Sequence, residues 1–550
     1  MAKDMNILSR NSTPPESGRH AVTEMIALQR RIFEKQRRII EAREAHLSPG
    51  FHKYRNEYRK AVSGFVSPSG FGALCDAIAA SRTAYVADYH TLRLSQRTFV
   101  KLIRGIMPQV DHICLCLELV PIRHQDTLDR FLEGRISEKT FLKRIEYRKH
   151  WPYDIWPHFK PIFDLAAEQG FVIIALDSNP SLSLKKRDQL AAEQIAAAAR
   201  RFPDALLLSL TGQMHTAPSH LPAAVDRAFV KAGMPVPERV IVYQNAEEIY
   251  WQLAEERKEG LEVVRVDDQS FCVNNTPPLV QQLSYLHWVQ ADSETMEFDE
   301  AEGTVRSLIQ TLGTFLNLPW AEAARTVRVL IPGDLDLMSV VEEGNLTAFE
   351  KQQLLLSVKA RQSVCIAKLS AVYLAGLSLN HAAEESAHFL KHTVSRGTVP
   401  KELRDRFYYF TLNEACGFLG SKIINPKRKT DHEGKLRKIA AAFRVENSRG
   451  TAEARGALFA LEHIALETRG RPLSTKAATL LRDPAVFHAA SHILGYILGD
   501  RLYYALTGGT VSKKHIKKLF AHPLDGPRVA QEEYFRIAER VRSVEMPRRI

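Results

Sequence analysis

Apolar residues in the first half of the chain form short β-branched runs that alternate with longer segments of helical spacing. Six runs predict strands: Thr83–Ala87, Ile113–Leu119, Phe171–Leu176, Ala205–Leu210, Val240–Tyr243 and Leu261–Val266. The segments between them predict helices near 95–106, 124–132, 137–149, 157–169, 185–201, 219–231 and 246–258. Parallel neighbours in a sheet need connections of about a dozen residues or more. The alternation therefore predicts an α/β fold with a mostly parallel sheet and helical crossovers, over residues 62–295.

The strand pattern nearly disappears after about residue 296, and long helical patterns replace it. Helices are predicted over 301–314, 320–329, 347–378, 379–395, 401–424, 434–445, 452–468, 474–481, 484–506, 512–520 and 527–542. The breaks fall at helix stops such as Pro319 and Asn425–Pro426. We expect a second, all-α domain over residues 296–550.

The first sixty residues show neither the strand pattern nor the long run of helices that follow them. Residues 1–20 are rich in Ser, Pro and Asn and predict a disordered lead. Residues 21–61 predict a basic amphipathic arm, since Met25, Leu28, Ile32 and Ile39 have helical spacing and arginines and lysines fill the rest of the helix. A helix packed on the body with a solvated basic face is the simplest interpretation, and contact with nucleic acid or lipid is the alternative.

Charge and composition narrow the class of protein. Lys and Arg number 75 against 63 Asp and Glu, a net charge of +12 that is mild for 550 residues. Basic clusters at 427–429, 513–518 and 548–549 lack interleaved aromatic residues, so we interpret them as solvated faces and do not expect a nucleic-acid partner. Six scattered cysteines give no disulfide framework. The N-terminus lacks an apolar signal, and the most apolar stretch, 369–379, is short of the roughly 18 to 20 residues that span a bilayer. These features predict a reduced, cytoplasmic protein without a membrane span.

Polar side chains follow four of the predicted strands. Asp88 and His90 follow the first run, Glu118 lies near the end of the second, Asp177 follows the third, and Gly212 and His215 follow the fourth. The carboxyl ends of parallel strands share one edge of a sheet, where ligands bind. Each residue alone has an ordinary explanation as a loop or turn residue, but together they indicate a site. Two imidazoles and a carboxylate can hold a divalent metal, or one His can act as base on a water that Glu118 orients. The candidate catalytic residues are His90, Glu118 and His215.

Several short motifs resemble one known family, the ChaN-like haem-binding uptake family, of the same superfamily as erythromycin esterases and Tiki proteases. They occur in the family's order: LCLEL at 115–119, QDTLDRFLEG at 125–134, the segment 151–176, GQMH at 212–215, and SFCVNNTPPLVQQLSYL at 270–286. The resemblance covers roughly residues 62–290.

The resemblance implies a cofactor site formed by Tyr89, His90, Glu118, Gly212 and His215, to which the position of Asp177 after its predicted strand adds that residue. In the haem-binding branch, Tyr89 or His90 would be the axial ligand of the iron. In the esterase branch a His and a Glu activate water, and in the Tiki branch equivalent groups bind a divalent metal. The family's Gly-Glu-x-His motif reads Ala87-Asp88-Tyr89-His90 here, so the carboxylate is shorter and the glycine is absent.

The predicted helical domain carries a second candidate metal site. His381, Glu385 and His388 are spaced by four and three residues, so they share one face of a helix, and Glu-x-x-His occurs in di-metal carboxylate bundles. His488 and His492 could form a partner face, with Glu414, or with Glu462 and His463, on other helices. The alternative is a polar helix face that makes ordinary hydrogen bonds.

Three hypotheses follow from these features. The first is a ChaN-like protein that binds haem or a divalent metal at the carboxyl edge of the sheet. The second is a hydrolase of the erythromycin-esterase or Tiki type that uses a His/Glu pair, with His90 or His215 as the base and Glu118 as its partner. The third is a scaffold with a vestigial pocket, in which the basic arm and the helical domain recruit a protein partner.

Overall fold

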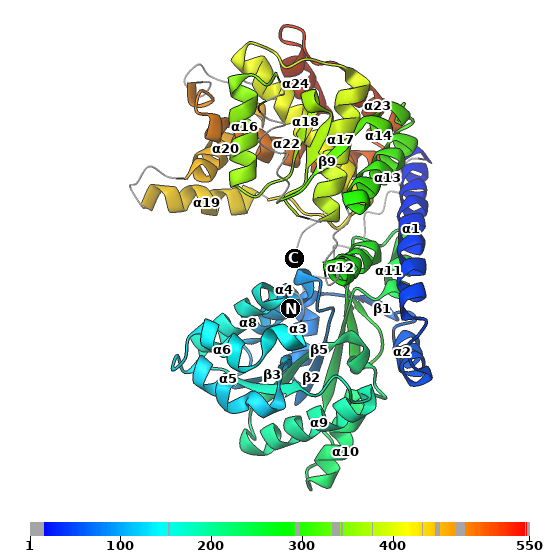
Figure 1. Ribbon diagram of the computed structural model, residues 1–550, viewed down its shortest axis with the longest axis vertical. Coiled ribbons are helices and arrows are strands. Elements are labelled where there is room, and N and C mark those ends of the chain that lie inside the picture. The colour runs from blue at the N-terminus through cyan, green and yellow to red at the C-terminus, as the bar shows by residue number, and fades with distance from the viewer. Residues whose placement is uncertain are drawn as a thin grey trace. The chain divides into compact units, whose positions relative to one another are not determined.

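The chain forms two compact units in a computed structural model that describes residues 16–151, 154–291, 298–332, 342, 345–376, 378–431, 433–445, 451–468, 479–544 and 546. An α/β unit comprises residues 32–295, and a helical unit comprises residues 1–31 and 296–548 (Figure 1). Helix α1 (Glu16–Glu44) belongs in part to each. Its first turns take up residues 16–20, which the sequence assigned to the disordered lead, and residues 1–15 lie outside the described residues.

An eight-stranded sheet forms the centre of the α/β unit, in the order β1-β7-β8-β6-β2-β5-β3-β4. From β8 to β4 all neighbouring strands are parallel, whereas β7 pairs antiparallel with β8 and β1. This confirms the mostly parallel sheet. Two short strands, β1 and β8, escaped prediction because three or four residues give too little periodicity. The strands are β1 (Ser67–Ser69), β2 (Thr83–Asp88), β3 (Ile113–Pro121), β4 (Val172–Asp177), β5 (Leu206–Gly212), β6 (Arg239–Gln244), β7 (Val263–Arg265) and β8 (Ser270–Val273).

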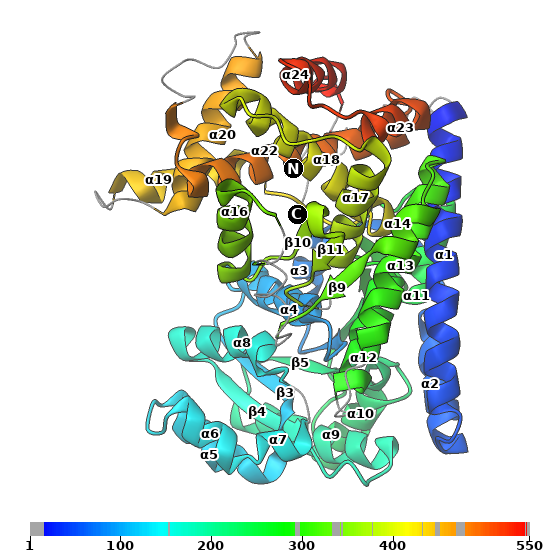
Figure 2. The same cartoon turned by 45° about the horizontal axis from the view of Figure 1, so that its top comes forward.

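Helices cover both faces of this sheet. On β2, Ala84 and Val86 belong to a core shared with α3, α4, α5, α6 and α8, while Tyr85 belongs to the opposite core, shared with α2, α9, α10 and α11. Figures 1 and 2 show α4 and α8 on one side of the sheet and α9 and α10 on the other. Burial on both faces explains the continuous apolar runs of the central strands. The helices of this unit are α2 (Pro49–Ala61), α3 (Phe71–Ala79), α4 (Arg93–Ile106), α5 (Gln125–Leu132), α6 (Glu138–Arg144), α7 (Tyr147–His150), α8 (Trp156–Gln169), α9 (Leu184–Arg201), α10 (Leu221–Lys231), α11 (Glu247–Glu255) and α12 (Pro278–Ala291).

The helical unit is predominantly helical, as predicted, but it also contains a small sheet. Strands β9 (Arg328–Leu330), β10 (Val364–Ile366) and β11 (Ala371–Tyr373) pair in the order β10-β11-β9. The helix predicted over 347–378 is therefore wrong. Helix α16 ends at Lys359, Arg361 adopts a positive φ of 54° that a helix does not tolerate, and the β-branched residues that follow form strands. The remaining helices are α13 (Phe298–Leu316), α14 (Ala321–Thr326), α17 (Leu379–Ser395), α18 (Leu403–Ile424), α19 (Glu433–Val445), α20 (Ala452–Thr468), α22 (Pro484–Thr507), α23 (Lys513–Ala521) and α24 (Val529–Val541). The helix predicted over 474–481 falls mostly outside the described residues.

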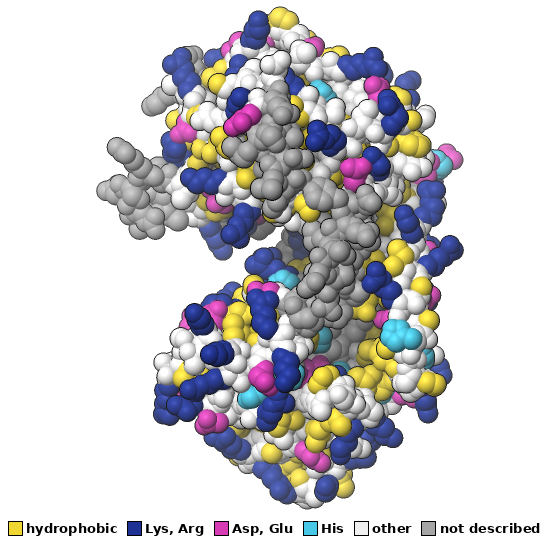
Figure 3. All heavy atoms as spheres, in the orientation of Figure 1, with side chains coloured by type: hydrophobic (Ala, Val, Ile, Leu, Met, Phe, Trp, Pro, Cys, Tyr) yellow, Lys and Arg dark blue, Asp and Glu magenta, His cyan; other side chains and the backbone are white. Residues whose placement is uncertain are grey.

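Surface composition agrees with a solvated exterior. On the face shown in Figure 3, Lys and Arg side chains are spread over the surface of each unit and do not gather in one patch. Among the described residues, no helix combines the length and the apolar character that crossing a membrane requires.

Glycines allow α17, α18 and α22 to approach one another closely. A methyl group at Gly499 on α22 would lie 2.6 Å from the carbonyl oxygen of Ala415 on α18, and one at Gly420 on α18 would overlap Ala387 on α17. At such distances the backbone itself would have to move. The three helices can therefore carry polar side chains into a common space between them.

We expect Gly499→Ala to destabilise the helical unit by about 1 to 3 kcal/mol, because the added methyl group overpacks the contact between α18 and α22. Gly303→Ala is the matched control, since Gly303 lies on the exposed side of α13 with no atom within 4 Å of the added group. There the gain in helix propensity should leave stability unchanged or raise it slightly. Urea unfolding followed by circular dichroism measures both, and equal midpoints for the two variants would contradict the packing argument.

Candidate functional site

The parallel strands bring the predicted site residues to one edge of the sheet. Strands β2, β5, β3 and β4 are consecutive neighbours, and Asp88 at the end of β2 pairs directly with Gly212 at the end of β5. The short 3₁₀ helix η2 (Gln213–Thr216) follows β5 and carries His215. Chain order alone would not reveal this neighbourhood, because β2 and β5 are separated by two other strands in sequence.

Gly212 lies at the centre of the cluster. A methyl group at this position would lie 3.3 Å from Nε2 of His90, 3.4 Å from Oε2 of Glu118 and 3.5 Å from Cδ2 of His215. The backbone N–H of Gly212 donates to Oε2 of Glu118 at 2.5 Å. The structure thus brings the three candidate catalytic residues together around a glycine.

Each of the two histidines is anchored by a buried carboxylate. Nδ1 of His90 lies 2.7 Å from Oδ2 of Asp88, and Nδ1 of His215 lies 2.7 Å from Oδ1 of Asp188. An ionised carboxylate only accepts, so each Nδ1 carries the proton and donates it. In the neutral ring this leaves the lone pair on Nε2, which is the nitrogen that faces the cluster.

Further side chains hold these carboxylates in place. Gln96 donates to the other oxygen of Asp88 at 2.6 Å, and the hydroxyl of Tyr54 donates to Oδ2 of Asp188 at 2.8 Å. Asp188, Tyr54 and Arg187 were not predicted to be site residues. The available signal was Arg187-Asp188 within an amphipathic helical pattern, but only the fold shows that Asp188 points inward.

Arg187 links two of the predicted carboxylates. Its guanidinium donates to Oε1 of Glu118 at 2.8 Å and to Oδ1 of Asp177 at 3.1 Å. Nε2 of His215 lies 3.3 Å from the same Glu118 oxygen. Burial alone would raise the pKa of Glu118, but His215 and Arg187 outweigh it and hold that pKa well below its ordinary range.

The same network changes the protonation of its other members. Burial disfavours the charged form of His215, but Glu118 and Asp188 outweigh this effect and raise the pKa of His215 to about 10. Burial, followed by the charge of Glu118, raises the pKa of Asp177 to about 6 although Arg187 is adjacent. At neutral pH His215 is therefore an imidazolium held between two carboxylates.

His90 and His215 differ in their exposure to solvent and in the groups that face Nε2. The side chain of His90 is 26% exposed and its Nε2 has no hydrogen-bond partner among the described residues, whereas the side chain of His215 is 9% exposed and faces Glu118. The ring of Trp151 stands edge-on to His90, with ring centroids 5.0 Å apart.

Tyr89 is not brought into the cluster. Burial raises the pKa of Tyr89, and the groups that raise it further are Glu247, Tyr285 and Glu44. None of these groups bears on His90, whose charged neighbours are Asp88, Glu118 and His215. Tyr89 and His90 lie in the turn that follows β2, which the N–H of Leu92 closes by donating to the carbonyl of Tyr89 at 2.7 Å.

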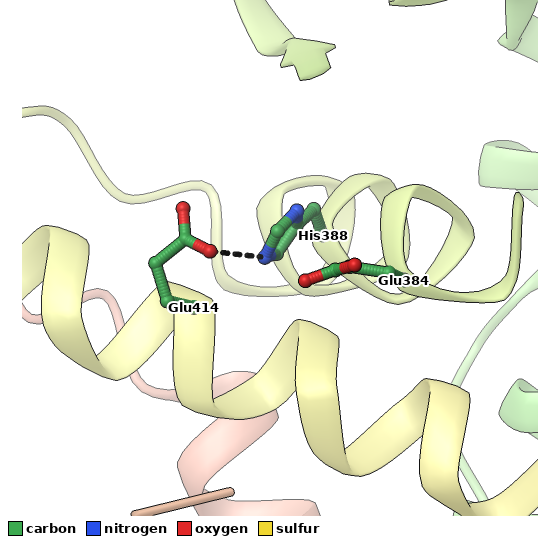
Figure 4. A group of neighbouring side chains, drawn as sticks. All are labelled: Glu384, His388 and Glu414. Atoms are coloured by element: carbon green, nitrogen blue, oxygen red, sulfur yellow. Dashed lines mark ion pairs between the residues drawn. The ribbon is translucent and has the colours of Figure 1, made fainter. Parts of the chain in front are cut away.

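In the helical unit, the structure brings together only two of the three residues predicted to bind metal. Nδ1 of His388 lies 3.0 Å from Oε2 of Glu385, but His381 is exposed at the start of α17. One ligand atom from each of Glu384, His388 and Glu414 lies within 4.8 Å of the others (Figure 4). Of the partner residues suggested by the sequence, His492 pairs with Glu414 at 2.9 Å, His488 contacts Gln362, and His463 pairs with Glu467.

Comparison with known proteins bears on the α/β unit. No curated protein and no solved structure matches the chain. Residues 74–186, about a fifth of the chain, match a family model. This segment contains β2 to β4 with His90, Glu118 and Asp177, and it ends one residue before Arg187. The resemblance inferred from the sequence is thus confirmed over residues 74–186, which match the family described as "Haem-binding uptake, Tiki superfamily, ChaN".

Proposed function

We propose that the α/β unit binds haem at the carboxyl edge of its sheet, where Nε2 of His90 would hold the iron. The observation that supports this most strongly is the pair formed by Asp88 and His90, 2.7 Å apart, together with the free and partly exposed Nε2. The family matched by residues 74–186 is described as haem-binding. Haem, when bound, supplies an iron centre that accepts an imidazole ligand.

The chain's own residues prepare His90 for this role. Asp88 accepts a hydrogen bond from Nδ1–H of His90, which fixes the tautomer and the orientation of the ring. The same bond makes Nε2 a stronger electron-pair donor toward a metal. Gln96 in turn holds Asp88, so the ring has little freedom to rotate away. Trp151 is fixed by donating from Nε1 to the carbonyl of Leu119 at 3.2 Å, and it places an aromatic edge beside His90. An apolar aromatic neighbour suits a macrocycle that must be shielded from water.

Glu118 and His215 fit an axial ligand less well. Both oxygens of Glu118 already accept hydrogen bonds, one from Gly212 and one from Arg187. A guanidinium 2.8 Å from this carboxylate also places a positive charge where a bare divalent cation at Glu118 would bind. We assign Glu118, His215 and Arg187 to a charged network that supports the site and does not hold the iron.

A hydrolase is the second candidate, and one observation favours it. Asp188, His215 and Glu118 form a continuous array in which both ring nitrogens of His215 face a carboxylate, at 2.7 and 3.3 Å. General-base catalysis requires a neutral imidazole at the working pH. A pKa of about 10 keeps His215 protonated, so in this array it can act as an acid or stabilise an anion, but not abstract a proton from water.

The haem proposal is tested by titrating the purified full-length chain with hemin and following the Soret band. His90→Ala should abolish the ligand-dependent band shift, and Asp88→Asn should weaken binding by about 10- to 100-fold because the ring loses its anchor. His112→Ala, an exposed histidine of the same unit, should bind as the wild type does. Unchanged binding by His90→Ala would rule out this ligand.

The pH dependence of His215 separates the two candidates. Because the folded pKa is raised, its contribution to stability is complete below the unfolded pKa of about 6.5 and is lost as pH rises through about 10. The free energy of unfolding of the α/β unit should therefore fall by on the order of a few kcal/mol between pH 7 and pH 10. In His215→Gln this slope should largely disappear. Imidazole ¹⁵N shifts typical of a neutral ring at pH 7 would contradict the assignment and favour the hydrolase.

A further inference from the structure

Three helices of the helical unit bring carboxylates and imidazoles into one buried space. Glu384 and His388 lie four residues apart on α17, and Glu414 projects from α18 toward them (Figure 4). Nε2 of His388 is 4.0 Å from Oε2 of Glu414. From α22, Nδ1 of His492 lies 2.9 Å from the same oxygen of Glu414. This cluster is separate from the site at the edge of the α/β sheet and lies outside residues 74–186.

Two of these side chains have ligand atoms without a partner. Nδ1 of His388 lies 3.0 Å from Oε2 of Glu385, and its Nε2 is buried with no hydrogen-bond partner among the described residues. Glu384 is 97% buried; its Oε2 accepts from Arg428 at 2.7 Å, while Oε1 is buried and accepts no hydrogen bond in the described part of the chain. Leaving a buried donor or acceptor atom unsatisfied costs free energy, so the presence of these atoms calls for an explanation.

The cluster is rich in buried carboxylates. Glu384, Glu385 and Glu414 contribute three of them, and Arg428 is the guanidinium that pairs with Glu384. Buried charges are expected to be paired or to coordinate metals, and carboxylates from two helices around one imidazole form a donor set that a divalent cation can occupy.

Glycines on α18 and α22 make room for the side chains of this cluster. A side chain at Gly417 on α18 would overlap the imidazole of His388, and one at Gly495 on α22 would overlap the Cβ of Glu414. Glycine at both positions lets the ligand-bearing side chains lie against the neighbouring backbones.

We propose that Glu384, His388 and Glu414 bind one divalent transition-metal ion within the helical unit. The ligand atoms are a carboxylate oxygen from each Glu and Nε2 of His388. Glu385 orients His388, Arg428 orients Glu384 and His492 orients Glu414. These outer contacts are the arrangement that metal-binding histidines and carboxylates ordinarily have.

The donor set also selects the class of metal. An imidazole nitrogen with carboxylate oxygens suits iron(II), manganese(II) or zinc(II), whereas magnesium and calcium are bound mostly by oxygen atoms. His381, which the sequence grouped with Glu385 and His388, is not among the ligands because it is exposed.

The experiment uses the full-length chain, stripped with EDTA and desalted, and titrates it with Mn²⁺ and Zn²⁺ by calorimetry, with elemental analysis of the product. We expect one equivalent of either metal, and no saturable binding of Mg²⁺ or Ca²⁺ at the same concentrations. His388→Gln and Glu414→Gln should each weaken binding by more than about 100-fold, and Glu385→Gln, which removes only the orienting group, by about 10- to 100-fold.

His392→Gln is the matched control, because His392 lies on α17 one turn beyond His388 and outside the cluster. It should bind metal as the wild type does. Far-ultraviolet circular dichroism checks that each variant folds. If a variant of a ligand residue does not fold, Glu385→Gln still tests the proposal, because it removes only the group that orients His388. The His90→Ala variant should retain the metal, so a failure of haem binding is distinguishable from a failure here. A wild type that takes up neither metal, or a His388→Gln variant that binds normally, would overturn the proposal.

Discussion

A buried carboxylate behind a histidine is the interaction on which both candidate sites depend. Asp88 holds His90, Asp188 holds His215, and Glu385 holds His388, at 2.7, 2.7 and 3.0 Å between Nδ1 and the carboxylate oxygen. A carboxylate in the interior is costly unless it is paired or hydrogen-bonded, and a ring N–H satisfies it. The same bond fixes which ring nitrogen carries the proton, so the requirement for stability and the preparation for ligand binding are met by one contact.

Close packing at glycine is the second constraint. Gly212 lies where His90, Glu118 and His215 meet, and Gly417 lies where the ring of His388 crosses α18. At Gly417 any larger residue would overlap the imidazole of His388, whereas a methyl group at Gly212 would only come into close contact with His90, Glu118 and His215. The two units use different frameworks, a sheet edge in one and a helix bundle in the other, yet in each a glycine lies where the polar groups converge.

The periodicity of the sequence was sufficient for the main strands and most helices, because burial on both faces of a parallel sheet leaves unbroken apolar runs. It was also sufficient to predict that Asp88, Glu118, Asp177 and Gly212 lie at one edge of the sheet, because parallel pairing places the carboxyl ends of the strands together. Asp188 and Arg187 were missed because they come from the crossover helix α9, and the phase of a helix relative to a site cannot be inferred from spacing without knowing how the helix packs. The same uncertainty explains why Glu384 was overlooked in favour of Glu385: the two are adjacent, and only the packing of α17 on α18 decides which one faces Glu414. The strands β10 and β11 were missed because three-residue strands have no detectable period.

His90, His215 and His388 differ in the groups that surround Nε2, because Nδ1 of each ring contacts a carboxylate. Nε2 of His215 meets Glu118, so the ring is pinned as an imidazolium and serves as a fixed positive charge. Nε2 of His90 meets no protein acceptor and remains partly exposed, which leaves it open to a ligand that arrives from solvent. Nε2 of His388 is buried among carboxylates that are too distant to hydrogen-bond with it, as the 4.0 Å to Glu414 shows, and this is the geometry of ligands arranged around an ion. In our proposals one carboxylate–histidine pair thus serves as a structural charge, as a site for an external ligand or as an internal metal site, according to the surroundings of the second nitrogen.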